Sequence, residues 1–176
     1  MNKPSYSLFH SFMQKIASSR PGSWFFSRTA HHFDRVFLKL SGGRMTLVGV
    51  LSGLPVIVLT TTGAKTGLPR TLPVLGIRDS EDPNQFAIIA HNYGQHHHPA
   101  WYFNLKNKPH ATCSIDGQVK TYIAHEANGE EYDRFWQSAS ETYIGFPLYK
   151  QRVVDRSITI MILTPEDSSS PSQKTN

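Results

Sequence analysis

The feature that most constrains the fold is a succession of short apolar runs from Pro55 onward, each bounded by Gly, Pro, Asp or Asn. Runs of this length separated by turn-forming residues are typical of strands. The Asp116-Gly117 pair predicts a tight hairpin between two of them. The six predicted strands are Val56–Thr61, Thr71–Ile77, Gln85–His91, His110–Asp116, Gln118–His125 and Ile158–Leu163. Six short strands predict a small antiparallel barrel.

Four segments carry helical spacing instead. Pro99–Asn107 and Glu130–Thr142 lie between the strands, and two amphipathic segments, 5–18 and 23–40, precede them. The fold class is therefore mainly β with α (α+β), with amino-terminal helices and short decorating helices. The aromatic and basic residues of 23–40 fit packing on the core, and they also fit contact with a membrane surface. Both interpretations can hold together.

The length of 176 residues fits a single globular unit, at roughly 100–200 residues per domain. We expect helices over 1–40, the barrel over 41–165 and a disordered tail over 166–176, because the tail is rich in Ser and polar residues and has no apolar anchor. No apolar run approaches the roughly 18 residues of a spanning helix. Residues 1–20 have no continuous apolar stretch and no small-residue cleavage site, so we expect no secretory signal, and Cys113 is the only cysteine. A reducing cytoplasm is therefore expected.

The charge balance is basic, with 18 Lys and Arg against 13 Asp and Glu, a net charge of +5. This excess favours anionic partners but does not choose among a phosphate cofactor, nucleic acid and lipid headgroups. Nucleic acid is disfavoured, because the Lys and Arg residues are scattered and no recognition motif is present.

A loop between the first two predicted strands has the chemistry of an anion site. Gly63 and Gly67 allow backbone amides to turn towards an oxyanion, Thr66 offers a hydroxyl, and Lys65 and Arg70 supply positive charge. The spacing is not that of a P-loop. On spacing alone, a plain basic hairpin loop is as good an interpretation as a phosphate site.

Two further clusters combine aromatic and polar side chains. Residues 91–104 contain three consecutive histidines, which cannot easily converge on one metal ion, so no metal is predicted there. Pro99 would begin a helix that carries aromatic residues in its first turn. Residues 143–149 space three aromatic residues by three positions, and the phenols of Tyr143 and Tyr149 could donate a proton or a hydrogen bond to a ligand. The aromatic residues after Pro99 could equally belong to a core helix, and the tyrosines of 143–149 could be surface residues of a Pro-Gly loop without a function.

Taken together, these clusters resemble the deazaflavin (coenzyme F420)-dependent nitroreductase and quinone reductase family. The resemblance covers roughly residues 38–165 and rests on TTTGAKTGLPRTLPV, HNYG, HPAWYFNL, the NKP behind it and a last apolar strand that ends at Thr164-Pro165. It implies a split β-barrel that binds reduced coenzyme F420, a hydride carrier with a phosphate and an acidic tail. The chain would be an oxidoreductase, and the net positive charge would suit this cofactor.

The resemblance also implies roles for individual residues. The cofactor phosphate would be bound by Lys65, Thr66, Gly67 and Arg70. Pro73 would lie under the part of the cofactor that links its phosphate to its ring. Residues 90–92 and 100–102 would surround the deazaflavin ring, and the cluster at 143–149 would orient the acceptor. The ring residues are Ala90, His91, Asn92, Ala100, Trp101 and Tyr102; the acceptor residues are Tyr143, Phe146 and Tyr149, with Tyr143 and Tyr149 as the proton donors.

The acceptor is expected to be a small molecule with a quinone-like, nitro or other activated unsaturated group. Phe146 stands where nitroimidazole-reducing members have Tyr, which favours quinones. Two alternatives stay open at this point: a split-barrel oxidoreductase that uses FMN, and a cofactor-binding or lipid-surface module without turnover. Localisation is expected in the cytoplasm, with the amino-terminal helices as the part that could touch the inner face of the cell membrane.

Overall fold

The computed structural model describes residues 8–25, 29, 49, 53–79, 81–115 and 117–166. The strands are β1 (Val56–Thr62), β2 (Pro69–Arg78), β3 (Phe86–Ile89), β4 (His110–Ile115), β5 (Gln118–Glu126) and β6 (Ile160–Pro165). The helices are α1 (Leu8–Ser18), the short 3-10 turn η1 (Asn92–Gly94), α4 (Ala100–Asn107), α5 (Gly129–Thr142) and α6 (Gly145–Arg152).

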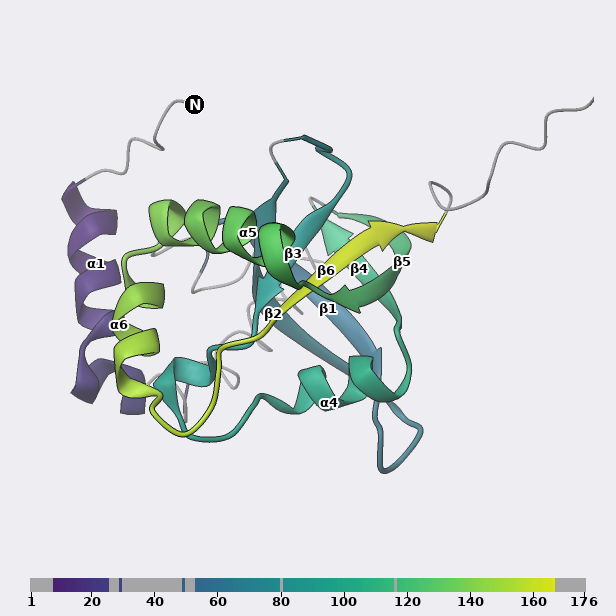
Figure 1. Ribbon diagram of the computed structural model, residues 1–176, viewed down its shortest axis with the longest axis horizontal. Helices are drawn as coiled ribbons and strands as arrows, with labels where there is room; N and C mark the ends of the chain where they lie inside the picture. The colour runs from purple at the N-terminus through teal and green to yellow at the C-terminus, as the bar shows by residue number, and fades with distance from the viewer. Residues whose placement is uncertain are drawn as a thin grey trace, which may run out of the picture.

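The six strands form a closed barrel in the order β1-β2-β3-β6-β5-β4, and every neighbouring pair is antiparallel (Figure 1). The predicted six-stranded antiparallel barrel is thereby confirmed. Several strand ends differ from the prediction, and the last strand is Ile160–Pro165 rather than Ile158–Leu163. The third strand stops at Ile89, two residues early, because the chain turns into η1, and the second begins at Pro69 because the hairpin loop before it is shorter than expected.

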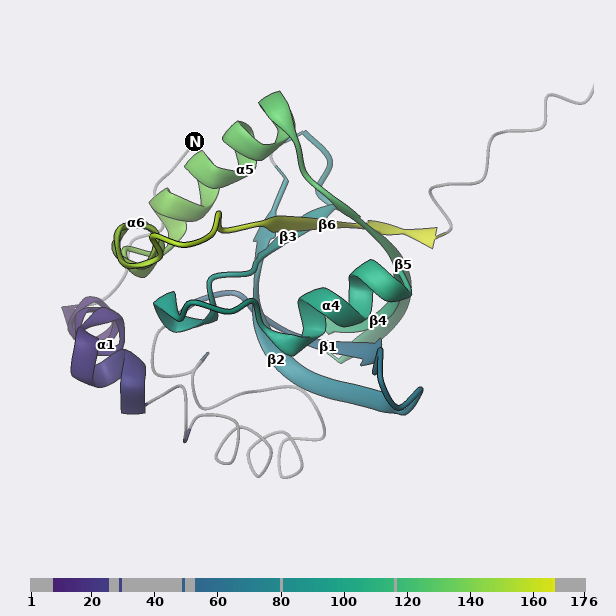
Figure 2. The ribbon, with the colours of Figure 1, turned by 60° about the horizontal axis from the view of Figure 1, so that its bottom comes forward.

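The hydrophobic core has two parts on either side of the barrel wall. Inside the barrel, Leu59, Ile88 and Leu163 are fully buried and contact Trp101 and Leu105 of α4. α4 therefore covers one end of the barrel, as Figure 2 shows. The second part lies outside the wall, under α5 and α6. It contains Phe135, Ala139, Phe146, Tyr149, Ile160 and Ile162. β6 is buried on both faces because it lies between the two parts.

α6 is a helix that the sequence did not predict. It follows α5 almost directly, and its Pro147 lies in the first turn, where the missing N–H costs nothing. In Figures 1 and 2, α1 lies beside α6 on the outside of the molecule, remote from the loop that joins β1 and β2. The last helix therefore connects α1 to the barrel.

Some predictions fall on residues that the structure does not describe. Most of the expected helix 23–40 and the tail after Glu166 lie outside the described residues. Before them, the chain bends at Ser19 and is helical again over 20–25. Within the described ranges, no helix has both the length and the hydropathy that crossing a membrane requires.

Candidate functional site

The loop at residues 63–70, called here the anion loop, is held by its own backbone. The amides of Gly63 and Gly67 donate to the carbonyl oxygens of Leu68 (2.9 Å) and Gly63 (2.8 Å). Gly67 has a φ of +68°, which favours glycine, and a Cβ at Gly63 would lie 2.8 Å from the Thr66 hydroxyl. Both glycines are therefore needed for the shape of the loop. Both amides already donate internally, so each would have to give up its present bond to contact an anion, and the cofactor contact expected of Gly67 stays a prediction.

Asn104 of α4 fixes the anion loop to the barrel. Its buried side chain accepts a hydrogen bond from the amide of Ala64 and donates one to the hydroxyl of Thr61, both at 2.9 Å. A buried amide with partners on two elements stabilises their relative position. The base of the loop is thus fixed while its tip extends into solvent.

Two residues of the anion loop carry positive charge. Lys65 and Arg70 are exposed, and an Nη atom of Arg70 donates to the hydroxyl of Thr66 at 3.4 Å. An ammonium beside a guanidinium suits a phosphate, because each N–H donor forms a charge-assisted hydrogen bond. The donors available to an anion are therefore these side chains, and the residues present fit a phosphate group.

The segment after β3 adopts an uncommon backbone. Asn92, Tyr93 and Gly94 have φ values of 44°, 55° and 77°, which places three consecutive residues in the left-handed region. A tyrosine rarely adopts this conformation, and such residues cluster at functional sites. The side-chain amide of Asn92 donates to the carbonyl of His97 (2.9 Å), and the amide of Tyr93 donates to Nδ1 of His91 (3.0 Å). The segment is thus held by local hydrogen bonds.

Arg156, from the segment between α6 and β6, holds this left-handed segment in place. Its guanidinium donates to the carbonyl oxygens of Ala90 (3.2 Å), His91 (3.3 Å) and Gln95 (3.1 Å), and it lies 3.3 Å from Nδ1 of His98. One planar cation therefore fixes carbonyl groups on both sides of η1. Burial, followed by the charge of Arg156, lowers the pKa of His98, which leaves that ring neutral as an acceptor.

His91 is half-buried, and its ring lies among aromatic rings. Its ring stacks on Tyr149 with centroids 4.9 Å apart and meets Phe146 edge-on at 5.2 Å. Burial, together with the nearby Arg156 charge, lowers the pKa of His91 to about 3. The imidazole is therefore neutral at physiological pH, and Nδ1 accepts a hydrogen bond while Nε2 carries the proton.

This shift makes the stability of the protein depend on pH. The unfolded chain binds a proton at His91 below about pH 6.5, whereas the folded chain does so only near pH 3. The contribution of His91 to the free energy of unfolding is therefore fully present above pH 6.5. It is lost as the pH is lowered towards 3, by up to about 1.4 kcal/mol per pH unit. We expect His91→Gln, which can still accept from Tyr93, to flatten urea-unfolding free energies over this range. Exposed His97→Gln is the control, and parallel profiles for the two variants would contradict the assignment.

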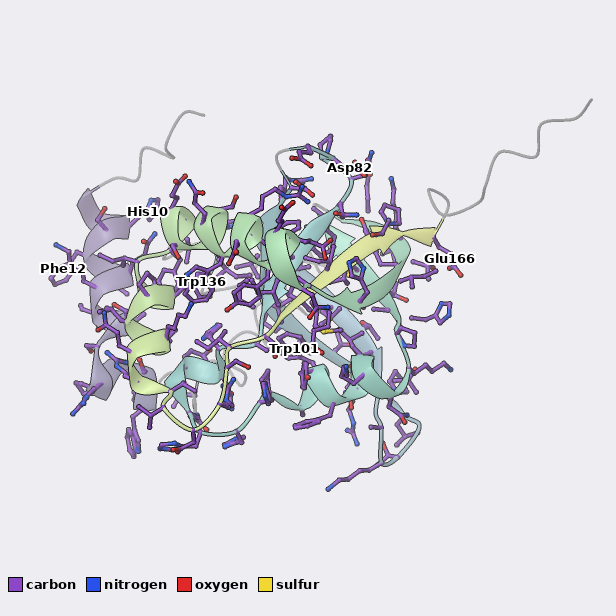
Figure 3. All side chains as sticks on the ribbon, viewed as in Figure 1. His10, Phe12, Asp82, Trp101, Trp136 and Glu166 are labelled. Atoms are coloured by element: carbon purple, nitrogen blue, oxygen red, sulfur yellow. The ribbon has the colours of Figure 1, made fainter. Side chains whose placement is uncertain are left out.

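The residues expected around a deazaflavin ring divide into two groups. Ala90, His91 and Asn92 lie together at the end of β3, within reach of Arg156. Trp101 is buried against the barrel interior rather than facing solvent, and Figure 3 shows it between α4 and the barrel.

The other residues of α4 and β2 are more open. Ala100 is exposed at the start of α4, and Tyr102 is half-buried, stacked on His98 at 4.4 Å. The hydroxyl of Tyr102 donates to Glu126 at 3.3 Å. Pro73 is half-buried in the middle of β2, opposite Val58. The structure thus leaves α4 and β2 partly accessible beside the left-handed segment.

Tyr143, Phe146 and Tyr149 are all buried. The hydroxyls of Tyr143 and Tyr149 lie 3.0 Å apart, and that of Tyr149 donates to the carbonyl of Ala17 in α1 at 3.3 Å. Burial raises the pKa of both phenols. The hydroxyl of Tyr149 is therefore occupied by its contact with α1.

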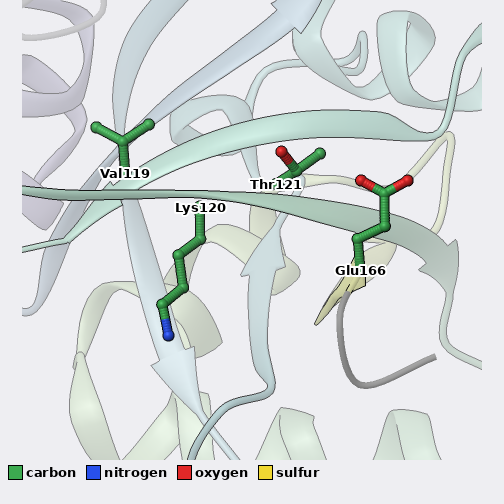
Figure 4. Close-up of a pocket in the computed structure, with 4 residues that line it drawn as sticks. All are labelled: Val119, Lys120, Thr121 and Glu166. Carbon is green, nitrogen blue, oxygen red and sulfur yellow. The ribbon is translucent and has the colours of Figure 1, made fainter. Parts of the chain in front are cut away.

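A pocket of about 570 Å³ lies beside this cluster. It is called here the arginine pocket and is lined by Arg20, Ser23, Trp24, Tyr93, Gly94, Gln95 and Arg152. A second, smaller hollow of about 280 Å³ lies on the outer surface of β5 near Glu166, as Figure 4 shows, and it contains none of the predicted site residues. Among the described residues, no three His, Cys, Asp or Glu side chains come together as metal ligands.

The fold and the site define a class of protein: a small antiparallel barrel with a cationic loop between its first two strands. The chain belongs to the family described as F420H(2)-dependent quinone reductase, whose pattern matches residues 32–165. It is 30% identical over 112 residues to an F420H(2)-dependent quinone reductase of Mycobacterium tuberculosis, which covers 62% of this chain and 73% of that protein. The expected family and the cofactor of that family are confirmed.

Two solved structures resemble the chain. One is described as an F420-H2 dependent reductase, with 33% identity, a TM-score of 0.56, and coverage of 62% of this chain and 93% of that one. The other is described as a domain-swapped dimer, with 29% identity, a TM-score of 0.58, and coverage of 81% and 98%. The expected split-barrel fold is consistent with both.

Sequence reasoning missed four residues that organise the site. Arg156 and Arg152 lie in stretches without a recognisable motif, and Arg20 precedes a proline in a segment assigned only to helix. Asn104 was inside the HPAWYFNL pattern, and its position three residues after Trp101 could have indicated a polar group facing the barrel. The other three depend on contacts between distant segments.

Proposed function

We propose that this protein transfers a hydride from reduced coenzyme F420 to a quinone, with the cofactor phosphate on the anion loop and its ring beside the left-handed segment. The observation that carries the proposal is the anion loop, which exposes Lys65 and Arg70 and whose base is fixed by Asn104. Coenzyme F420 supplies the hydride when bound. Family membership supports the same chemistry.

The protein's own contribution is binding, orientation and exclusion of water. Arg156 and the local hydrogen bonds fix Ala90, His91 and Asn92 before any ligand arrives. Such preorganisation places a ring at a defined distance from its reaction partner. The neutral His91 cannot act as an acid near pH 7, since its pKa is about 3.

The acceptor is proposed to enter through the arginine pocket, next to the buried Tyr149 and the half-buried His91. The Tyr149 hydroxyl could then exchange its hydrogen bond with Ala17 for one with the acceptor, while Arg152 stays bonded to Ser18 and Ser23. A phenol of raised pKa can still donate a proton to a quinone oxygen as that oxygen gains charge. This assignment of the two tyrosines rests on their position beside the pocket.

Titration with F420 and with FMN tests the cofactor directly. We expect F420 to bind stoichiometrically, with quenching of its own fluorescence, and FMN to bind at least tenfold more weakly. Tighter binding of FMN, accompanied by a flavin spectrum in the purified protein, would select the FMN alternative.

We propose in addition that α1 and the helical turn after it contact a membrane surface. Phe12 and Ile16, one turn apart, are 61% and 40% exposed, and Trp24 and Phe25 are 61% and 50% exposed. Figure 3 shows Phe12 projecting away from the molecule. Lys15 and Arg20 stand near these side chains in the sequence, a combination typical of interfacial helices.

We expect the double variant Phe12→Ser/Ile16→Ser to lower partitioning onto phosphatidylglycerol-containing vesicles by about tenfold or more, because burying each apolar side chain contributes about 1.5–3 kcal/mol. Sedimentation of the full chain with vesicles measures this. The matched control is Phe103→Ser/Val119→Ser, which removes exposed apolar side chains on other elements. Equal partitioning of both double variants would contradict the proposed surface.

A further inference from the structure

The arginine pocket carries positive charge. Two guanidinium groups, Arg20 and Arg152, line it, and no carboxylate is found among the described residues that line it. Arg20 is exposed. Two cations facing one pocket raise the local concentration of anions there.

Arg152 is held in a fixed orientation. Its Nη atoms donate to the carbonyl of Ser18 (2.6 Å) and to the hydroxyl of Ser23 (3.2 Å), and its guanidinium lies 5.6 Å from the ring centre of Tyr149. These partners are uncharged, so they position the guanidinium without neutralising it. The positive charge therefore remains available to a ligand.

The walls of the pocket suit a flat molecule. Trp24 and Tyr93 offer aromatic rings, and Gly94 brings bare backbone to the pocket. Gly94 has a φ of +77°, which disfavours a larger residue, and a Cβ there would lie in van der Waals contact with Tyr149 and Arg152 at 3.4 Å. Aromatic walls with a guanidinium at the edge can bind an aromatic ring by stacking and its charged substituent by hydrogen bonds.

The pocket is separate from the anion loop. It lies where α1 and the residues after it meet η1 and α6, whereas the anion loop joins β1 and β2 at the opposite side of the molecule in Figures 1 and 2. One anion at each place can therefore be bound at the same time. A phosphate bound at the anion loop leaves Arg20 and Arg152 available to a second anion.

We propose that the arginine pocket selects aromatic acceptors that carry a negative charge, such as a carboxylate or sulfonate on a quinone ring. This specificity rests on the proposed function, since it describes the acceptor of the same reaction. Arg20 is the residue that determines it, and Arg152 supplies a second charge that α1 keeps in position.

Direct binding tests the pocket without turnover. Calorimetry of the full chain with 1-naphthalenesulfonate, in the absence of F420, should show binding that neutral 2-naphthalenemethanol lacks. Arg20→Gln should weaken it about tenfold or more, Arg20→Lys should retain most of it, and remote Lys120→Gln should leave it unchanged. Equal binding by wild type and Arg20→Gln, or loss of binding in Lys65→Ala/Arg70→Ala instead, would overturn the proposal.

Turnover provides the second readout. The ratio of kcat/KM for 1,4-naphthoquinone-2-sulfonate to that for 1,4-naphthoquinone should fall about tenfold or more in Arg20→Gln relative to wild type, because intrinsic reactivity cancels in this comparison. An unchanged ratio would overturn the proposed specificity. If neither quinone oxidised reduced F420, the proposed function would fail, while the calorimetric result would still decide whether the pocket binds aromatic anions.

Discussion

Replacing both Lys65 and Arg70 with alanine is expected to weaken F420 binding by about a hundredfold or more. Each side chain can form a hydrogen bond with a charged phosphate, and such bonds contribute about 1.5–3 kcal/mol. The loop itself should keep its shape, because the backbone of Gly63 and Gly67 and the side chain of Asn104 hold it independently of both cations. Fluorescence titration with F420 measures the effect.

The control is Lys15→Ala/Lys120→Ala, which removes the same two charges from α1 and β5. It should leave the affinity for F420 within about threefold of wild type, since surface charges beyond about 8–10 Å are screened at physiological salt. Similar losses in both double variants would mean that net charge, rather than the anion loop, attracts the cofactor.

Arg156→Lys is expected to lower kcat for quinone reduction by about tenfold to a hundredfold, with a much smaller change in F420 affinity. Lysine keeps the charge, but its single ammonium cannot replace the planar donor group that holds Ala90, His91 and Gln95. The left-handed segment would then shift, and a displacement of about 1 Å can cost about a hundredfold in rate. Steady-state kinetics separates kcat from the affinity for F420.

Arg78→Lys is the matched control, because Arg78 also donates to a backbone carbonyl, that of Pro83, but on the far loop between β2 and β3. Its kcat should stay near that of wild type. Added guanidinium should restore part of the activity of Arg156→Ala if positioning is the role of Arg156. Wild-type kcat in Arg156→Lys would show that the left-handed segment does not position the reacting groups.

The barrel could be predicted from the sequence because its strands are short, apolar and separated by strong turn signals. The Asp116-Gly117 pair and the alternation in β1, where Ile57, Leu59 and Thr61 are buried, are local features. α6 was missed because Gly145 and Pro147 are typical of a loop. Its helix is stabilised by tertiary packing, since Phe146 and Tyr149 are buried under α1 and α5.

The candidate site was predicted only where its residues are close in sequence. Lys65, Thr66 and Arg70 lie in one hairpin loop, so a motif can contain them. The Arg156 contacts join residues about sixty positions apart, and the hydrogen bond from Tyr149 to Ala17 spans 132 positions. A local sequence pattern cannot predict such contacts. The burial of Trp101 was missed for the same reason, since it depends on how α4 covers the barrel.

Hydride transfer from reduced F420 to a quinone is the reaction proposed for this protein. The most direct test mixes the purified full chain with reduced F420 and menadione, without oxygen, and follows the return of oxidised F420 absorbance in a stopped-flow instrument. We expect rapid, saturable oxidation that requires the protein and becomes slower in Lys65→Ala/Arg70→Ala at subsaturating F420. Oxidation at the rate of the uncatalysed mixture, with F420 bound, would contradict the account.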